Sequence, residues 1–110
     1  MSLHSDLRHR ADTLAIVLTG RIDRDAAQTL DAAYAAARAT GADGLELDFT
    51  AVDYINSTGI ALIVGVLARA RAERVRLQAT GLTAHYQHIF EITRLSDFIE
   101  IVQPSTPAEH

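Results

Sequence analysis

The regular alternation of strand patterns with helix patterns constrains the fold of this sequence more than any other feature. Residues 44–49 alternate apolar and polar side chains at a period of two, which is typical of a strand. Residues 24–39 instead place apolar side chains at helical spacing in an alanine-rich segment. Strands that alternate with helices form a largely parallel or mixed sheet. The sequence therefore predicts an α/β fold in the order β-β-α-β-α-β-α-β, with about four to five strands and three to four helices.

The N-terminal part of the chain predicts a hairpin. Leu3 and Leu7 belong to a weak apolar alternation, and residues 11–12 look like a turn. A continuous apolar run over residues 14–18 suits a central strand that is buried on both faces. The stretch 20–23 then ends the hairpin.

Each expected helix follows a residue type that favours the N-cap position. The candidate caps are Asp23 for a helix over residues 24–39, Asn56 or Ser57 for the second helix, and Thr83 for the third. The second helix is expected from Ile60 to about Glu73, and two further strands are expected over 75–79 and 98–102.

The composition excludes several kinds of chemistry. The chain has 110 residues, the size of one domain, so we expect one domain over 1–110, with its core over about 5–102 and a flexible tail over 103–110. It contains no Cys, and Arg supplies all ten basic residues. Disulfides, thiol nucleophiles and Schiff-base lysines are therefore excluded. The formal net charge of −4 argues against bulk affinity for nucleic acid or anionic lipid.

The distribution of apolar residues predicts a cytoplasmic protein that does not insert into membranes. No apolar run approaches the ~20 residues of a membrane span. The first ten residues mix His, Asp and Arg, unlike a signal peptide.

The most specific stretch of the chain covers residues 48–59. A strand is followed there by a short apolar loop and by two adjacent hydroxyls, Ser57 and Thr58, which open a helix. In one interpretation, Ser57 only caps that helix. In the other, Ser57 is phosphorylated, because a phosphate is electrostatically favoured at a helix N-terminus. A phosphoserine there would bring about −1.5 to −2 charges at pH 7.

Three motifs together resemble a known family. They are Gly20-x-Ile22-Asp23, then Asp48-Phe49-Thr50-x-Val52-x-Tyr54-Ile55-Asn56-Ser57-Thr58-Gly59, and later Gly81-Leu82 through Phe90-x-Ile92-Thr93-x-Leu95. Over about residues 5–102 the chain resembles the STAS domain of bacterial anti-sigma-factor antagonists. The resemblance implies the STAS fold.

The resemblance also implies a function. In that family the unphosphorylated antagonist binds an anti-sigma factor that is also a serine kinase, and this binding releases the sigma factor. The kinase inactivates the antagonist by phosphorylating the serine that matches Ser57, and a PP2C-type phosphatase restores it. Thr58 is a secondary acceptor, and Asp23 matches an acidic residue near the serine. The implied partner-binding residues are Asp23, Asn56, Ser57, Thr58, Gly59 and Ile60.

One residue departs from the family pattern. Asn56 stands where the family usually has Asp. Asn keeps the capping ability but removes a negative charge beside the acceptor. A kinase that recognises the Asp carboxylate of the family would bind this chain less well. The departure keeps an alternative open, namely a non-switching STAS module that serves a lipid-transport ATPase complex or a stress-signalling scaffold.

Catalytic and metal chemistry are not expected. Ser57 lies outside any Gly-x-Ser-x-Gly motif, and His85 and His88 of the third helix have no evident way to reach it. A metal on the two histidines would need a third ligand, so we expect a solvent-facing pair. We therefore expect no enzyme activity, cofactor or metal, and a monomer or weak dimer.

Two further features each admit two interpretations. The second helix is apolar nearly all round in its first half, so either it is covered or one edge beside Ser57 is an exposed docking ridge. Gly65 in its middle fits a close approach to the sheet or to a partner. The arginines near the end of that helix either offset the helix dipole and coat a solvated strand or contact an acidic partner; they are Arg69, Arg71, Arg74 and Arg76.

Overall fold

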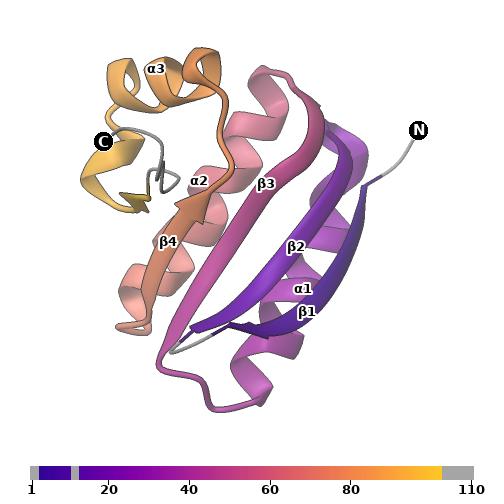
Figure 1. Cartoon of the computed structure of the whole chain (residues 1–110), viewed down its shortest axis with the longest axis vertical. Coiled ribbons are helices and arrows are strands. Elements are labelled where there is room, and N and C mark those ends of the chain that lie inside the picture. The colour runs from indigo at the N-terminus through magenta and orange to yellow at the C-terminus, as the bar shows by residue number, and fades with distance from the viewer. Residues whose placement is uncertain (1–2, 11–12, 103–110) are drawn as a thin grey trace, which may run out of the picture.

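The computed structural model describes residues 3–10 and 13–102 of the chain (Figure 1). The elements are, in chain order, β1 (His4–Arg10), β2 (Thr13–Ile22), the 3₁₀-helix η1 (Arg24–Ala26), α1 (Ala27–Ala39), β3 (Gly44–Ile55), α2 (Ser57–Ala72), β4 (Arg76–Thr80), α3 (Ala84–Ile92), the 3₁₀-helix η2 (Leu95–Asp97) and β5 (Glu100–Ile101). The expected turn at residues 11–12 and the expected tail at 103–110 lie outside the described residues.

The strands form one mixed sheet in the order β1-β2-β3-β4-β5, which confirms the expected fold class. β1 pairs antiparallel with β2, and every other neighbouring pair is parallel. Figure 1 shows α1 and α2 on one face of the sheet, with α3 beyond the end of β4. The carboxyl ends of β2 and β3 therefore meet the helix starts at one edge of the molecule.

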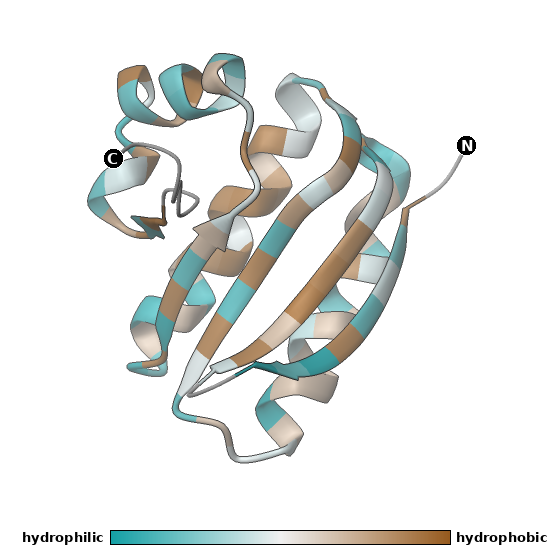
Figure 2. Cartoon of the chain, in the orientation of Figure 1, coloured by the Kyte–Doolittle hydropathy of each residue, from teal (hydrophilic) through white to brown (hydrophobic). Residues whose placement is uncertain are grey.

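The core lies between the sheet and these helices. The apolar run of β2 forms part of it, with Leu14, Ile16 and Leu18 buried, and Figure 2 shows the hydropathy alternating along β3. Tyr34 of α1 and Phe90 of α3 are fully buried, and Phe90 meets Phe49 edge to face at 6.0 Å between ring centroids. Burial of these side chains is the main term that stabilises the fold.

Several element boundaries differ from those expected. β3 continues to Ile55, so residues 50–55 are strand rather than loop, because the ten-residue β2 offers pairing partners along this extension. Residues 24–26 form the 3₁₀-helix η1 instead of the first turn of α1. α2 begins at Ser57, one turn earlier than expected, and the last strand shortens to Glu100–Ile101.

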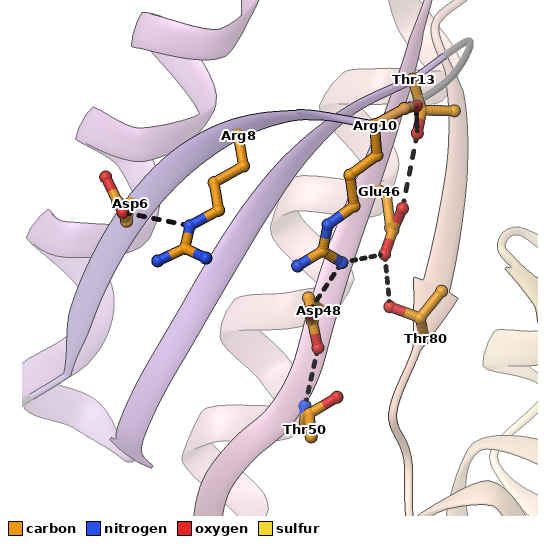
Figure 3. Close-up of polar contacts among 8 residues, drawn as sticks. All are labelled: Asp6, Arg8, Arg10, Thr13, Glu46, Asp48, Thr50 and Thr80. Atoms are coloured by element: carbon orange, nitrogen blue, oxygen red, sulfur yellow. Dashed lines mark hydrogen bonds and ion pairs between the residues drawn. The ribbon is translucent and has the colours of Figure 1, made fainter. Parts of the chain in front are cut away.

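The sheet face away from α1 and α2 carries a charged network that the sequence patterns did not reveal (Figure 3). The Arg10 guanidinium donates to Glu46 at 2.9 Å and to Asp48 at 2.8 Å. Thr80 donates to Glu46 at 2.7 Å, and the backbone N–H of Thr50 donates to Asp48 at 2.9 Å. Glu46 and Asp48 are the buried charged residues among those described, with 7% and 6% of their surfaces exposed.

The network holds Asp48 in its ionised form. Burial raises the pKa of this carboxyl, but hydrogen bonds from Thr50 and Arg10 outweigh burial and lower the pKa below its ordinary value of 3.8. Because the pKa of Asp48 is lower in the folded state, the ionised carboxylate stabilises the fold at pH values above 3.8. This contribution is lost as the pH falls through the lowered pKa.

We predict that Arg10→Met lowers the free energy of unfolding at neutral pH by about 1–3 kcal/mol, because two buried carboxylates lose a donor. The variant should also lose less stability than the parent between about pH 5 and pH 2, since the pKa of Asp48 is no longer lowered by Arg10. Urea titrations across this pH range measure both effects. Arg8→Met is the control, because Arg8 lies on the same strand and its one ion pair among the described residues is with the exposed Asp6. An unchanged acid slope in Arg10→Met would contradict the assignment.

Candidate functional site

Asn56 caps the helix that carries the two hydroxyls. Its backbone is extended, and its side-chain oxygen accepts a hydrogen bond from the N–H of Gly59 at 2.8 Å. The structure thus decides between the two candidate caps in favour of Asn56, and the interpretation of Ser57 as the cap is wrong. Ser57 is the first residue of α2.

The hydroxyls of Ser57 and Thr58 are free for other chemistry. Both residues are exposed, and neither side chain hydrogen-bonds to another residue in the described part of the chain. The first turn of α2 contains no acidic residue. An anion at this position would meet the positive end of the helix dipole and the unpaired N–H groups of the first turn.

A close contact joins the end of β2 to the start of α2. The carbonyl of Ile22 accepts from the N–H of Asn56 at 3.3 Å. A Cβ on residue 59 would collide with that same carbonyl oxygen, so the position requires glycine. This contact fixes Asp23, the residue after Ile22, beside the first turn of α2, where η1 packs against the helix. Ile60, the residue after Gly59, is half-buried.

Asp23 already has two partners within its own segment. Its carboxylate accepts from the backbone N–H of Asp25 at 3.0 Å, which caps η1 as the sequence predicted, although for a 3₁₀-helix. The Arg21 guanidinium lies 3.9 Å from its other oxygen and 5.0 Å from the centroid of the exposed Tyr54 ring. The Asp23 carboxylate therefore lies beside the site, and the Arg21 guanidinium partly offsets its negative charge.

Sequence reasoning missed Arg21, Tyr54 and Tyr86. Arg21 and Tyr54 become neighbours through the register of β2 with β3, which shifts twice along the pair. The Tyr86 hydroxyl accepts from the N–H of Ile55 at 2.9 Å and ties α3 to the end of β3. Only the Tyr54 position carried a signal, since it belongs to the motif before Ser57.

One edge of α2 is open to solvent, which decides between the two interpretations of this helix. Ala61, Val64 and Ala68 are exposed, whereas Ile63, Val66 and Leu67 are buried. A Cβ on Gly65 would meet nothing within 4 Å. A close approach of Gly65 to the sheet is therefore wrong, and the open edge is available to a partner.

The remaining candidate residues are the two histidines of α3 and the arginines near the end of α2. His85 and His88 are both exposed, as expected, and no described group of three His, Cys, Asp or Glu residues could hold a metal ion. Arg69 pairs with Asp31 at 3.4 Å and lies over the Tyr34 ring, in line with a structural role at the helix end. Across the described residues, no helix is both long and apolar enough to cross a membrane.

A family model and a curated relative both place this chain in the STAS-domain family. Residues 5–103 match the family described as "Mlab, STAS domain". The anti-sigma-B factor antagonist of Listeria monocytogenes is 32% identical over 102 residues, which cover 92% of this chain and 90% of the relative.

Solved structures share the fold at lower identity. An anti-sigma factor antagonist from Mycobacterium paratuberculosis has a TM-score of 0.76 at 16% identity, covering 96% of this chain and 88% of that one. The Bacillus protein SpoIIAA in its phosphorylated form has a TM-score of 0.67 at 19% identity, covering 94% and 93% of the two chains.

We predict that the two residues at the start of α2 differ sharply in their effect on stability. Asn56→Ala should lower the free energy of unfolding by about 1 kcal/mol, because the N–H of Gly59 loses its cap. Ser57→Ala should leave stability within about 0.5 kcal/mol, because the exposed hydroxyl makes no hydrogen bond to the described residues. Thermal and urea unfolding of both variants test this. A larger loss in Ser57→Ala than in Asn56→Ala would mean that Ser57 is the cap after all.

We also predict opposite effects of one substitution at two glycines of α2. Gly59→Ala should destabilise the fold by about 1–3 kcal/mol, because the new methyl group collides with the Ile22 carbonyl. Gly65→Ala should stabilise it by up to about 1 kcal/mol, since the methyl group meets open space and alanine favours the helix. Unfolding titrations of the matched pair measure both, and a neutral Gly59→Ala would contradict the close contact.

Proposed function

Because this chain belongs to the STAS-domain family, which includes anti-sigma-factor antagonists, we propose that it is such an antagonist and that phosphorylation of Ser57 switches it off. The unphosphorylated protein binds an anti-sigma factor with serine kinase activity and so releases a sigma factor. A PP2C-type phosphatase reverses the modification. The protein works in the cytoplasm as a monomer or weak dimer, without a cofactor, and is a substrate of enzymes rather than an enzyme.

One observation carries this proposal. Ser57 presents at the N-terminus of α2 an exposed hydroxyl that makes no hydrogen bond to the described residues, while Asn56 caps the helix. A kinase can transfer the γ-phosphoryl group of ATP to this oxygen without removing any contact that holds the helix. Thr58, which is also exposed, is the secondary acceptor. The relative SpoIIAA, solved in a phosphorylated form, supports the idea that this fold can carry a phosphate.

The phosphate acts on the docking surface. It adds about −1.5 to −2 charges at pH 7, and the helix dipole favours an anion at this end, so α2 persists. Asp23 and the exposed Asp53 already place carboxylates on neighbouring segments. A partner that approaches this surface with apolar or acidic groups would meet a larger desolvation and repulsion cost after phosphorylation. The partner-binding residues are those of this edge: Asp23, Asn56, Ser57, Thr58, Gly59 and Ile60.

Asn56 favours the phosphorylated state in comparison with Asp. A carboxylate next to the acceptor would repel the phosphate, whereas the amide side chain is neutral and keeps the cap. The kinase of this antagonist must accordingly recognise its substrate without a carboxylate at position 56.

A second function is supported by one specific observation. The matching family is described as a Mlab-type STAS domain, and Asn56 departs from the antagonist pattern. In this alternative, the domain is a non-switching module, such as a subunit of a lipid-transport ATPase complex or a stress-signalling scaffold. An open apolar edge on α2 serves either function. Co-purification with an ATPase subunit instead of a kinase would favour the alternative.

We predict that an anti-sigma serine kinase from the same genome, incubated with this protein and ATP, adds one phosphate at Ser57. Ser57→Ala should abolish the modification but keep binding, and Ser57→Asp should weaken binding at least about tenfold. Phosphosite mass spectrometry and calorimetry measure these effects, with Thr58→Ala as the matched control. A protein that acquires no phosphate on Ser57 or Thr58, or a Ser57→Asp variant that binds normally, would overturn the switch.

A further inference from the structure

An apolar groove lies between the open edge of α2 and the segment that contains η2. It has a volume of about 290 Å³ and is lined by Val64, Leu67, Ala68, Arg71, Thr93, Leu95 and Phe98. Leu67 and Leu95 are buried at its floor, whereas Val64 is 42% exposed and Phe98 is 49% exposed. Large apolar side chains exposed around one groove are typical of a docking surface.

Ser57 lies on the same face of α2 as two of the residues that line the groove. Positions 57, 61, 64 and 68 follow the spacing of one helix face, and all four residues are exposed. Val64 and Ala68 also line the groove. A partner that covers Ser57 and extends along this face of α2 therefore reaches the groove within three helical turns.

The charge of the groove points to the chemistry of its occupant. Arg71 is the one charged residue among those that line it, and its guanidinium lies 5.0 Å from the centroid of the Phe98 ring. None of the ion pairs among residues 3–10 and 13–102 involves Arg71. The groove thus offers apolar walls with an unpaired cation at the rim.

We propose that this groove holds an acidic amphipathic helix of the anti-sigma factor, with an apolar side chain inserted between Val64 and Phe98 and a carboxylate against Arg71. The inference rests on the proposed function. Grooves between helical elements commonly take the apolar face of a partner helix. The groove supplies affinity, and the hydroxyl of Ser57 on the same helix face makes that affinity dependent on phosphorylation.

Two other occupants fit the observations less well. A second copy of this chain, docked groove to groove about a twofold axis, would bring two Arg71 side chains into one interface. Like charges that face each other across an interface oppose association. The chain's own residues 103–110 contain no large apolar side chain that could fill the groove.

The test measures calorimetric affinity for the anti-sigma kinase with two groove variants, Val64→Asp and Arg71→Glu. Each should weaken binding at least about tenfold. In the kinase reaction, each should raise the KM for this protein and leave kcat unchanged, because the groove contributes binding and does not touch the reacting atoms. The matched controls are Ala36→Asp on the exposed face of α1 and Arg8→Glu on β1, both of which should bind within about twofold of the parent.

The outcomes separate the groove from the proposed function. If Val64→Asp and Arg71→Glu bind normally while Ser57→Asp does not, the groove proposal is overturned and the switch stands. If the parent protein binds no anti-sigma kinase, both are overturned. If Val64→Asp only abolishes self-association in sedimentation equilibrium, the occupant is a second copy and the proposal is wrong. Circular dichroism confirms that each variant is folded, which the exposure of Val64 and Arg71 leads us to expect.

Discussion

The contact between the end of β2 and the start of α2 is the constraint on which the rest of the candidate site depends. The Ile22 carbonyl accepts a hydrogen bond from Asn56 and leaves no space for a side chain at Gly59. The backbones at the end of β2 and at the start of α2 are thereby held in direct contact, which a flexible loop would not achieve. The hydroxyl of Ser57 and the carboxylate of Asp23 keep a fixed relation because their backbones are anchored on both sides of this contact.

The sequence predicted the order of elements because strand and helix periodicities are local properties. The sequence also predicted a cap at Asp23, because capping depends on a residue type next to the helix start. It did not predict the burial of Glu46 and Asp48, since alternation in β3 marked them as the exposed side of a strand. Their burial depends on Arg10, which comes from the far side of β2. Such a network requires knowledge of strand order and register, which no local pattern contains.

The candidate site shows the same division between local and long-range information. The motif around Ser57 was readable, and the choice between Asn56 and Ser57 as the cap required only one hydrogen bond to settle. The contact between Arg21 and Tyr54 could not be predicted, because the two residues meet only after two shifts in the register of β2 with β3. The groove beside α2 was equally hidden, since Phe98 comes from a segment that follows β4 and α3 in the chain and meets α2 only in the folded structure.

The division of roles between Asn56 and Ser57 explains how a phosphate could alter binding without altering the fold. If a serine capped α2, its hydroxyl oxygen would hold the first turn, and phosphorylation would change the same atom that stabilises the helix. Asn56 removes this conflict because its amide oxygen makes the cap. The neighbouring hydroxyl makes no hydrogen bond within the described part of the chain, so a phosphate placed on it would leave the cap intact. A capped helix start and an exposed hydroxyl are thus consequences of one residue position, and in the proposed function the apolar edge of the same helix converts a local charge into a change of affinity.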